Sequence, residues 1–184
     1  VAHGALLAGL GMLAWEGASA WLAGGGAAGG AVQAVCADTD CTNEVQAVVR
    51  AGQRVWEMNP LERWRALHRI LGQNLPGRFP VVDRMVWEEG RAIGIKTIDL
   101  GAKSYQNLER LQQVVQGYIQ KLAEFQGARY GETIKAADIK IRELWLVIPG
   151  ANEGQWRVLQ TLQELAARSD VVLKIILWPS GGRQ

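Results

Sequence analysis

The stretch FPVVDRMVWEEGRAIGIKTIDL, residues 79–100, decides the fold because it has the pattern of two strands joined by a tight turn. Residues 80–87 and 91–98 are rich in β-branched and aromatic types, which favour strands. The turn signal Glu88-Glu89-Gly90 separates the two segments. The stretch therefore predicts a β-hairpin.

The hairpin carries one acid and one lysine that can meet across it. If the loop has an even number of residues centred on Glu89 and Gly90, position i faces position 179 minus i, and Asp83 lies opposite Lys96. Their Cβ atoms are then roughly 5 Å apart on one mostly apolar face. A loop of odd length would put them on opposite faces. A charged pair on such a face costs stability unless it is matched or takes part in chemistry.

A helix is predicted before the hairpin, with Asn59 as its cap, Pro60 at its first position and Gly72 at its end. His68 falls in an apolar row at helical spacing, so it is either a packed core histidine or a catalytic or ligating residue. Glu62 lies beside that row, so it either has a functional role or forms an ion pair on the helix surface.

The rest of the chain predicts an α/β fold with a mixed sheet flanked by helices. After residues 105–107 a long helix runs to about Phe125, and residues 128–142 have the loose pattern of a hairpin or an extended region. A central strand at 143–148, a helix at 150–169 and a strand at 171–178 follow. The buried stripe expected for the long helix is Leu108, Leu111, Val115, Tyr118, Ile119, Leu122 and Phe125.

Composition divides the chain into an N-terminal region, residues 1–59, and a second domain, residues 60–184. The first thirty residues contain nine Gly and nine Ala, which favours a marginal helix pair or a flexible leader that meets a membrane transiently, or a helical hairpin packed on its own protein. A helix capped by Thr42 is expected to run through about Met58. Because the chain starts with Val, we expect it to be a piece of a longer protein.

Charge and cysteine content differ between the two parts. Residues 1–59 hold two basic and five acidic side chains, whereas residues 60–184 hold eighteen basic and thirteen acidic ones. The basic part suits a polyanionic partner, although an ordinary soluble surface has the same composition. Cys36 and Cys41 either form a short disulfide loop or are two free thiols.

An acid on one strand, a lysine on the next and a second acid on a helix form a layout common in metal-dependent nucleases. Carboxylates hold a divalent ion that polarises the scissile phosphate and lowers the pKa of the attacking water. The lysine stabilises negative charge that develops on a phosphate oxygen, or positions the nucleophile. Spacing alone is weak support, because Asp–Lys pairs across strands are common.

Four short motifs add a resemblance to a known family: GQNLPGRFPVVDR at 72–84, GIKTIDL at 94–100, SYQN at 104–107 and GYIQKLAEF at 117–125. In this order they resemble the C-terminal toxin domains of contact-dependent growth inhibition (CdiA) proteins, in particular those with a PD-(D/E)xK, restriction-endonuclease-like fold. The resemblance covers roughly residues 60–178, and the Gly/Ala-rich region resembles the entry region before such toxins. It implies a nuclease that is delivered by a larger cell-surface protein into the cytoplasm of a neighbouring bacterium, and a cognate immunity protein that blocks it in the producing cell.

The resemblance assigns roles to three residues. Asp83 matches the metal-binding acid, Lys96 the lysine, and Glu62 the upstream glutamate, with His68 as another candidate on the same helix. The implied cofactor is a divalent metal, Mg²⁺ or Zn²⁺. The sequence departs from the family at Gly94, where an acid is usual and the closest relatives have serine. A main-chain oxygen, a water or a nearby side chain must take that place, the nearest side chains being Glu88, Glu89, Thr97 and Asp99.

Residues just after the hairpin are candidates for substrate contact. Tyr105 and Gln106 could stack on or hydrogen-bond to a nucleotide, or could form a capping and packing turn. Lys103 could join Arg129, Lys135, Lys140 and Arg142 in a phosphate-binding surface, or these could be scattered surface cations.

Several functions remain open at the level of sequence. DNA is the favoured substrate because the resemblance is to the DNase branch, but tRNases share the fold. A non-catalytic module that binds nucleic acid or a partner is a second hypothesis, and a membrane-acting toxin driven by residues 1–35 is a third. The exposed edge of 128–142 is a candidate surface for the immunity protein.

Overall fold

The computed structural model describes residues 55–178. The predictions for the Gly/Ala-rich region, for Cys36 and Cys41, and for most of the helix that starts at Thr42 therefore lie outside the described residues. Residues 55–58 form turns and a bend, so the prediction that this helix continues to Met58 is wrong at its end. Val55 is nevertheless fully buried, which makes this segment part of the folded unit.

The structure has the predicted α/β class. A four-stranded sheet has the order β1-β2-β5-β6, in which β1 is antiparallel to β2 and the other neighbours are parallel. A separate two-stranded sheet, β3-β4, forms where a loosely patterned hairpin was expected. The elements are α4 (Pro60–Ile70), β1 (Arg84–Val86), β2 (Arg91–Thr97), α5 (Leu108–Ala123), β3 (Gly127–Tyr130), β4 (Glu132–Lys135), β5 (Ile141–Ile148), α6 (Glu153–Arg168) and β6 (Val171–Leu177).

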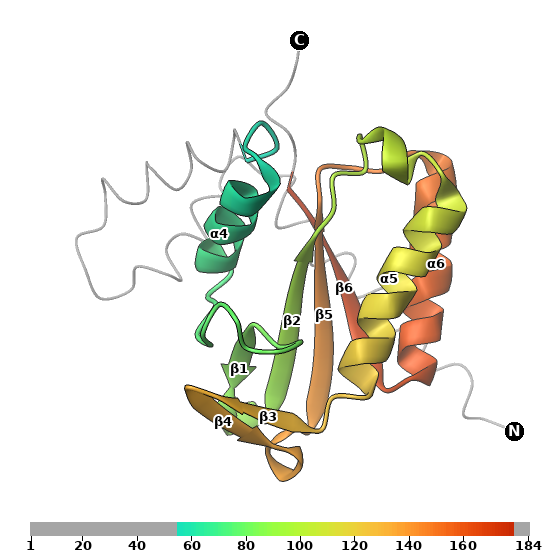
Figure 1. The fold of residues 1–184 in the computed structure, drawn as a ribbon. Coiled ribbons are helices and arrows are strands. Elements are labelled where there is room, and N and C mark those ends of the chain that lie inside the picture. The colour runs from blue at the N-terminus through green and yellow to red at the C-terminus, as the bar shows by residue number, and fades with distance from the viewer. Residues whose placement is uncertain (1–54, 179–184) are drawn as a thin grey trace, which may run out of the picture.

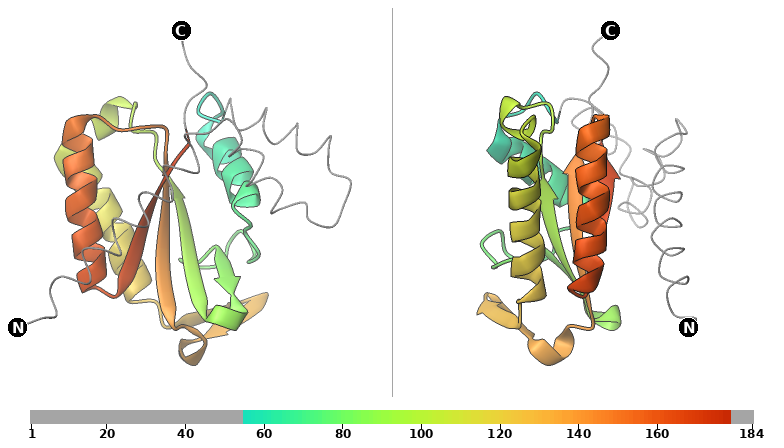
Figure 2. Two further views of the ribbon diagram at one scale, coloured as in Figure 1. Left: turned by 180° about the vertical axis from the view of Figure 1, so that it is seen from behind. Right: turned by 90° about the vertical axis from the view of Figure 1, so that its right-hand side faces the viewer.

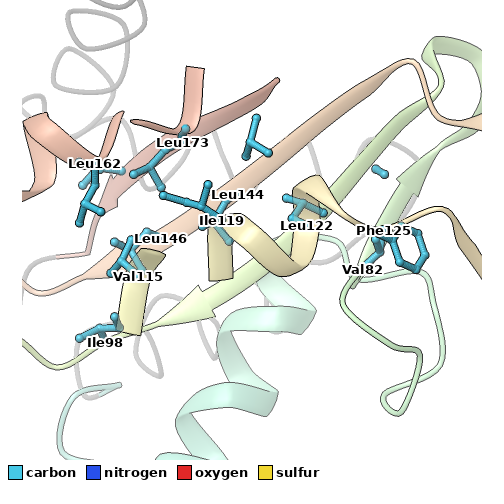
Figure 3. Close-up of a cluster of buried hydrophobic side chains, with 14 of the residues drawn as sticks. Val82, Ile98, Val115, Ile119, Leu122, Phe125, Leu144, Leu146, Leu162 and Leu173 are labelled. Atoms are coloured by element: carbon cyan, nitrogen blue, oxygen red, sulfur yellow. The ribbon is translucent and has the colours of Figure 1, made fainter. Parts of the chain in front are cut away.

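Helices cover both faces of the four-stranded sheet. Helices α5 and α6 lie side by side on one face, and α4 lies on the other, as the views in Figures 1 and 2 show. Alternate residues of β2 and β5 divide between two apolar clusters, one beneath α5 and α6 and one beneath α4. In Figure 3, Val115, Ile119 and Leu122 of α5 pack against the sheet side chains of the larger cluster. Both faces of the parallel strands are therefore buried, which explains their nearly continuous apolar sequence.

The helices begin where their capping residues predict. The Asn59 side chain accepts hydrogen bonds from the backbone N–H groups of Leu61 and Glu62 at the start of α4. Helix α5 follows Asn107, whose side chain accepts from the Arg110 N–H. The predicted stripe of α5 is wrong at one position: Leu108, the first residue of the helix, is 38% exposed. Within residues 55–178, none of the helices has the length and apolar character needed to cross a bilayer.

The hairpin forms, but with a shorter first strand and a different register. β1 has only three residues, because residues 80–83 are irregular and Val81 has a φ of 67°, outside the strand region. The pairs Arg84↔Ile93 and Val86↔Arg91 show that position i faces 177 minus i, so the expected register is wrong by two residues. A turn at residues 87–90 with Gly90 in the left-handed region explains the shift, since its centre lies one residue earlier than expected. A shift of two preserves the face on which each side chain lies.

Candidate functional site

Asp83 immediately precedes β1, at the point where the pairing of β1 with β2 stops and the edge of β2 becomes free. Its N–H donates to the Ile93 carbonyl at 2.9 Å, which prolongs the ladder by one bond. Beyond that point its own side chain continues the pairing, because Oδ2 accepts the Ile95 N–H at 2.7 Å. Asp83 as a whole residue is buried, with 7% of its surface exposed. The sheet therefore fixes this carboxylate at its edge, between the two layers of helices.

Lys96 reaches the same carboxylate. Its Nζ lies 3.3 Å from Asp83 Oδ2, so the predicted meeting of the acid and the lysine is confirmed. They meet diagonally, since the observed register sets Asp83 beside Gly94 rather than opposite Lys96. The Lys96 side chain is 28% exposed, compared with 10% for that of Asp83. The pair is thus open to solvent from the lysine side.

His68 approaches the carboxylate from α4. Its Nδ1 lies 3.5 Å from Asp83 Oδ1, and the residue is fully buried. Burial is the main cause that lowers the His68 pKa; the Asp83 charge opposes this shift and the Lys96 charge adds to it. The Trp64 ring packs against the imidazole with centroids 4.4 Å apart. His68 is therefore both a core residue and a direct neighbour of the predicted site.

Glu62 is not brought into this group. It is exposed in the first turn of α4, and its backbone N–H is held by the cap Asn59. Six residues separate it from His68, which is about 9 Å along the helix axis and a rotation of about 240°. Among the described residues no three His, Cys, Asp or Glu side chains converge closely enough to hold an ion.

The side chains considered as substitutes at Gly94 also lie elsewhere. Glu88 and Glu89 are exposed in the hairpin turn, at the opposite end of β2 from Lys96, about 20 Å away at ordinary strand spacing. Glu89 pairs with Arg91. Asp99 lies 3.8 Å from Arg63 of α4. Thr97 is half-buried and follows Lys96 on the strand, so its side chain points to the other face of the sheet.

A main-chain oxygen occupies the place next to Gly94. A Cβ added to Gly94 would lie 3.0 Å from the Val81 carbonyl oxygen. That carbonyl is held by a tight turn in which the Val82 N–H donates to Pro80 O at 2.7 Å, with Val81 at its strained centre. The glycine is therefore needed for the close approach of another backbone segment. Sequence reasoning left a main-chain oxygen as one option, but nothing in the sequence pointed to Val81.

The residues after β2 make packing contacts. The Gln106 side chain donates to Leu100 O at 2.9 Å, and the buried Gln155 side chain donates to Leu100 O and to Tyr105 O. Tyr105 also packs against the main core, whereas Lys103 is exposed. The turn therefore has the packing role that was one of the two predicted alternatives, and substrate contact by these residues stays a prediction.

The arrangement offers a small set of chemical capabilities. The Asp83 carboxylate lies 3.5 Å from the buried His68 imidazole on one side and 3.3 Å from the partly exposed Lys96 ammonium group on the other. The carboxylate and the imidazole are donors suited to a divalent ion, and the ammonium group can bind an anion such as a phosphate.

Comparison with known proteins agrees with the observed α/β fold. A family model described as the CDI toxin restriction endonuclease-like domain matches residues 63–176, more than half of the chain. Among solved structures, a chain from a CdiA-CT/CdiI toxin and immunity complex of Yersinia pseudotuberculosis has a similar fold, with a TM-score of 0.51 and 18% sequence identity over 58% of this chain and 89% of that one. The comparison with curated protein sequences finds no relative. The match over residues 63–176 establishes that the chain belongs to the restriction endonuclease-like toxin domains of contact-dependent growth inhibition.

Proposed function

We propose that the domain is a metal-dependent endonuclease that hydrolyses phosphodiester bonds of nucleic acid, with DNA as the favoured substrate. The observation that carries this proposal is the Asp83 carboxylate, fixed by the Ile95 N–H and met by Lys96 Nζ at 3.3 Å. An acid and a lysine held together at a sheet edge match the family's catalytic motif, to which both residues were assigned by resemblance.

The residues around Asp83 include donor atoms of the kinds that bind a divalent ion. Asp83 Oδ1 lies 3.5 Å from Nδ1 of the buried His68 imidazole. Asp83 would hold the ion together with a residue of α4, either Glu62, as the resemblance implies, or His68. When bound, a divalent ion such as Mg²⁺ or Zn²⁺ supplies Lewis-acid polarisation of the phosphate and a more acidic bound water.

The lysine and the protein surface supply the remaining parts. Lys96 donates hydrogen bonds to a non-bridging phosphate oxygen and stabilises the charge that develops there. Its partial exposure leaves it accessible to a backbone phosphate while its partner carboxylate stays largely buried. Lys103 and Gln106 are the nearest candidates in sequence for contacts with the flanking nucleotides.

Cleavage assays test the proposal directly. The purified full chain is incubated with supercoiled plasmid and, in parallel, with tRNA, in the presence of Mg²⁺, Zn²⁺ or EDTA. We expect metal-dependent nicking of plasmid that EDTA abolishes, and loss of cleavage in Asp83→Asn and Lys96→Gln. Cleavage of tRNA but not of plasmid would show that the domain is a tRNase rather than a DNase. If neither substrate is cut with any metal, the enzymatic proposal is wrong.

We further propose that a cognate immunity protein neutralises the domain and that delivery follows the family's route, from a larger cell-surface protein into a neighbouring bacterium. The β3-β4 hairpin is the candidate surface for the immunity protein. It forms a sheet of its own, and Tyr130 at its tip is 46% exposed. An edge of this kind can accept a strand from a partner. Tyr130→Asp should weaken a toxin–immunity complex in calorimetry without changing plasmid cleavage.

A non-catalytic binding module is the second candidate, favoured by the lack of an acid at position 94. It predicts that Asp83→Asn and Lys96→Gln leave toxicity unchanged when the chain is expressed inside a bacterium without an immunity protein. The nuclease proposal predicts that either substitution abolishes toxicity. A comparison of colony counts after induction, with immunoblots to equalise protein levels, separates the two.

A further inference from the structure

Arg63 of α4 is a charged side chain that is largely buried. Only 11% of it is exposed, and its guanidinium donates three hydrogen bonds of 3.2 Å to main-chain oxygens, from Nε to Val55 O and from Nη2 to Trp56 O and Met58 O. The guanidinium also lies 4.9 Å from the centre of the Trp56 ring, within the range of a cation–π contact. Arg63 therefore joins α4 to the segment that leads into it.

The same guanidinium also reaches the end of β2. Its Nη2 lies 3.8 Å from Oδ2 of Asp99, which follows Lys96 by three residues. Asp99 is itself held in a tight turn, because its Oδ1 accepts the Gly101 N–H at 3.1 Å and its main-chain oxygen accepts the Ala102 N–H at 3.0 Å. A largely buried guanidinium beside a fixed carboxylate thus links α4 to the strand that carries Lys96.

This link bears on the candidate site because the residues around Asp83 come from the two elements that Arg63 joins. β2 contributes Lys96, whose Nζ lies 3.3 Å from Asp83 Oδ2, and α4 brings His68 Nδ1 to 3.5 Å from Asp83 Oδ1. Arg63 and His68 are five residues apart on the helix, which is about 7.5 Å along its axis. A shift of α4 relative to the end of β2 would therefore change the surroundings of the Asp83 carboxylate.

The contacts of Arg63 suit a positioning role rather than contact with substrate. Its Nε and Nη2 are engaged by main-chain oxygens, and little of the side chain reaches solvent. A guanidinium presents five donors in a fixed plane, so it can hold several carbonyls and a carboxylate at the same time. The other arginines of α4, Arg65 and Arg69, are exposed. Among the arginines of this helix, Arg63 is therefore the one that joins separate segments.

We propose that Arg63 is a positioning residue of the candidate nuclease site: by tying the start of α4 to the end of β2, it sets the distance between α4 and the pair formed by Asp83 and Lys96. The inference rests on the proposed nuclease function and adds a residue that acts on the site from outside it. Loss of the guanidinium lets α4 and the strand end shift, and a displacement of about 1 Å at reacting groups can cost about 10²-fold in rate. Because Arg63 does not itself contact substrate, the loss falls on kcat rather than on KM.

Steady-state cleavage by the full chain tests the inference, with Arg65→Gln as the matched control because Arg65 is exposed on the same helix. Plasmid is cleaved with the metal ion that best supports the wild-type reaction, at a temperature well below the Tm of every variant. We expect Arg63→Gln to lower kcat at least about 10-fold and to change KM less than about 2-fold, and Arg65→Gln to leave both unchanged. An increase in KM as large as the loss in kcat, or a lower Tm with wild-type kcat, would overturn the inference.

A double-mutant cycle separates positioning from general destabilisation. Asp99→Asn removes the other half of the link and should lower kcat about 3-fold to 10-fold, and the double variant should be less than about 2-fold slower than Arg63→Gln alone. Losses in kcat that multiply in the double variant would overturn the inference. If Arg63→Gln does not fold, Asp99→Asn decides, because its side chain is 34% exposed, and an unchanged kcat in that variant would overturn the inference.

Hydrogen exchange separates failure of this inference from failure of the proposed function. The Ile95 N–H donates to the Asp83 carboxylate, and the Ile95 side chain packs in the cluster beneath α4, so its exchange reports the geometry of the site without cleavage. Arg63→Gln should speed exchange at Ile95 at least about 5-fold more than at Ile119, whose amide lies inside α5 and reports the stability of the whole domain. Equal acceleration at both amides would overturn the inference. Absence of wild-type cleavage with every metal would instead remove the nuclease proposal, and the exchange rates would still decide whether Arg63 positions α4.

Discussion

Gly94→Ala tests how the segment before β1 builds the site. The new Cβ would lie 3.0 Å from the Val81 carbonyl oxygen, and 3.8 and 4.0 Å from side-chain carbons of Leu144 and Leu122. The two carbon contacts are ordinary packing distances. The oxygen contact is not, and the oxygen belongs to the backbone of a turn closed by the 2.7 Å bond from Val82 to Pro80. The backbone must therefore shift to accept a methyl group.

Two opposing terms set the size of the effect. Replacement of glycine by alanine lowers the entropy of the unfolded chain and stabilises by about 0.4–1 kcal/mol where the backbone allows it. Overpacking against a fixed neighbour costs about 1–3 kcal/mol. The net expectation is a loss of about 1–2 kcal/mol, which corresponds to a fall in Tm of about 3–8 °C for a domain of this size. Because Asp83 follows Val81 by two residues, its carboxylate moves as well, and a displacement of about 1 Å can cost about 10²-fold in rate.

Thermal unfolding followed by circular dichroism measures the first effect, and plasmid cleavage at a temperature well below the transition measures the second. Gly117→Ala is the matched control, because a Cβ at Gly117 meets no atom within 4 Å and the residue lies inside α5. That control should gain about 0.5–1 kcal/mol and keep full cleavage activity. If Gly94→Ala is as stable and as active as Gly117→Ala, the reasoning about the Val81 carbonyl is refuted.

Three other substitutions give distinct expected outcomes. Lys96→Gln should lower the rate of plasmid cleavage by about 10²-fold to 10³-fold with little change in Zn²⁺ affinity, because it removes a phosphate contact rather than a metal ligand. An equal loss of Zn²⁺ affinity would contradict this division of roles. Glu143→Gln should destabilise the domain by about 1–3 kcal/mol in urea unfolding, because the buried Glu143 carboxylate accepts two hydrogen bonds of 3.0 Å from Lys174. Plasmid cleavage at low temperature should persist, and unchanged stability would show that water satisfies the lysine. Asn59→Ala should lower the Tm by about 3–5 °C, because it removes the cap of α4 and costs about 1 kcal/mol, and no change would show that the first turn is held by other contacts.

The sequence predicted the elements of the fold because each has a local cause. Asn59 and Pro60 define the start of α4, and apolar runs define β2 and β5, both of which the structure contains. The register of the hairpin was wrong because it depends on the conformation of the turn, and Gly90 in the left-handed region closes the loop one residue earlier than expected. The exposure of Leu108 was missed because a periodic pattern does not show how much of the first turn of a helix is covered by its neighbours.

For the candidate site, too, the sequence predicted some contacts and missed others. The meeting of Asp83 and Lys96 could be predicted because an alternation of two along each strand puts them on one face in either register. The position of His68 beside them could not, since it depends on how α4 crosses the sheet. The contact of the Val81 carbonyl with Gly94 depends on a strained turn in which Val81 has a φ of 67°, a conformation that valine rarely adopts and that no sequence pattern predicts here.

By itself the sequence determined the fold class and the acid–lysine pair, because these follow from local patterns of side-chain type and spacing, and four short motifs indicated the family by their resemblance to known toxin domains. Only the tertiary structure decided which residue of α4 faces the carboxylate and what lies beside Gly94. Both depend on contacts between segments that are distant along the chain, and such contacts are set by the packing of helix against sheet rather than by the propensity of either segment alone.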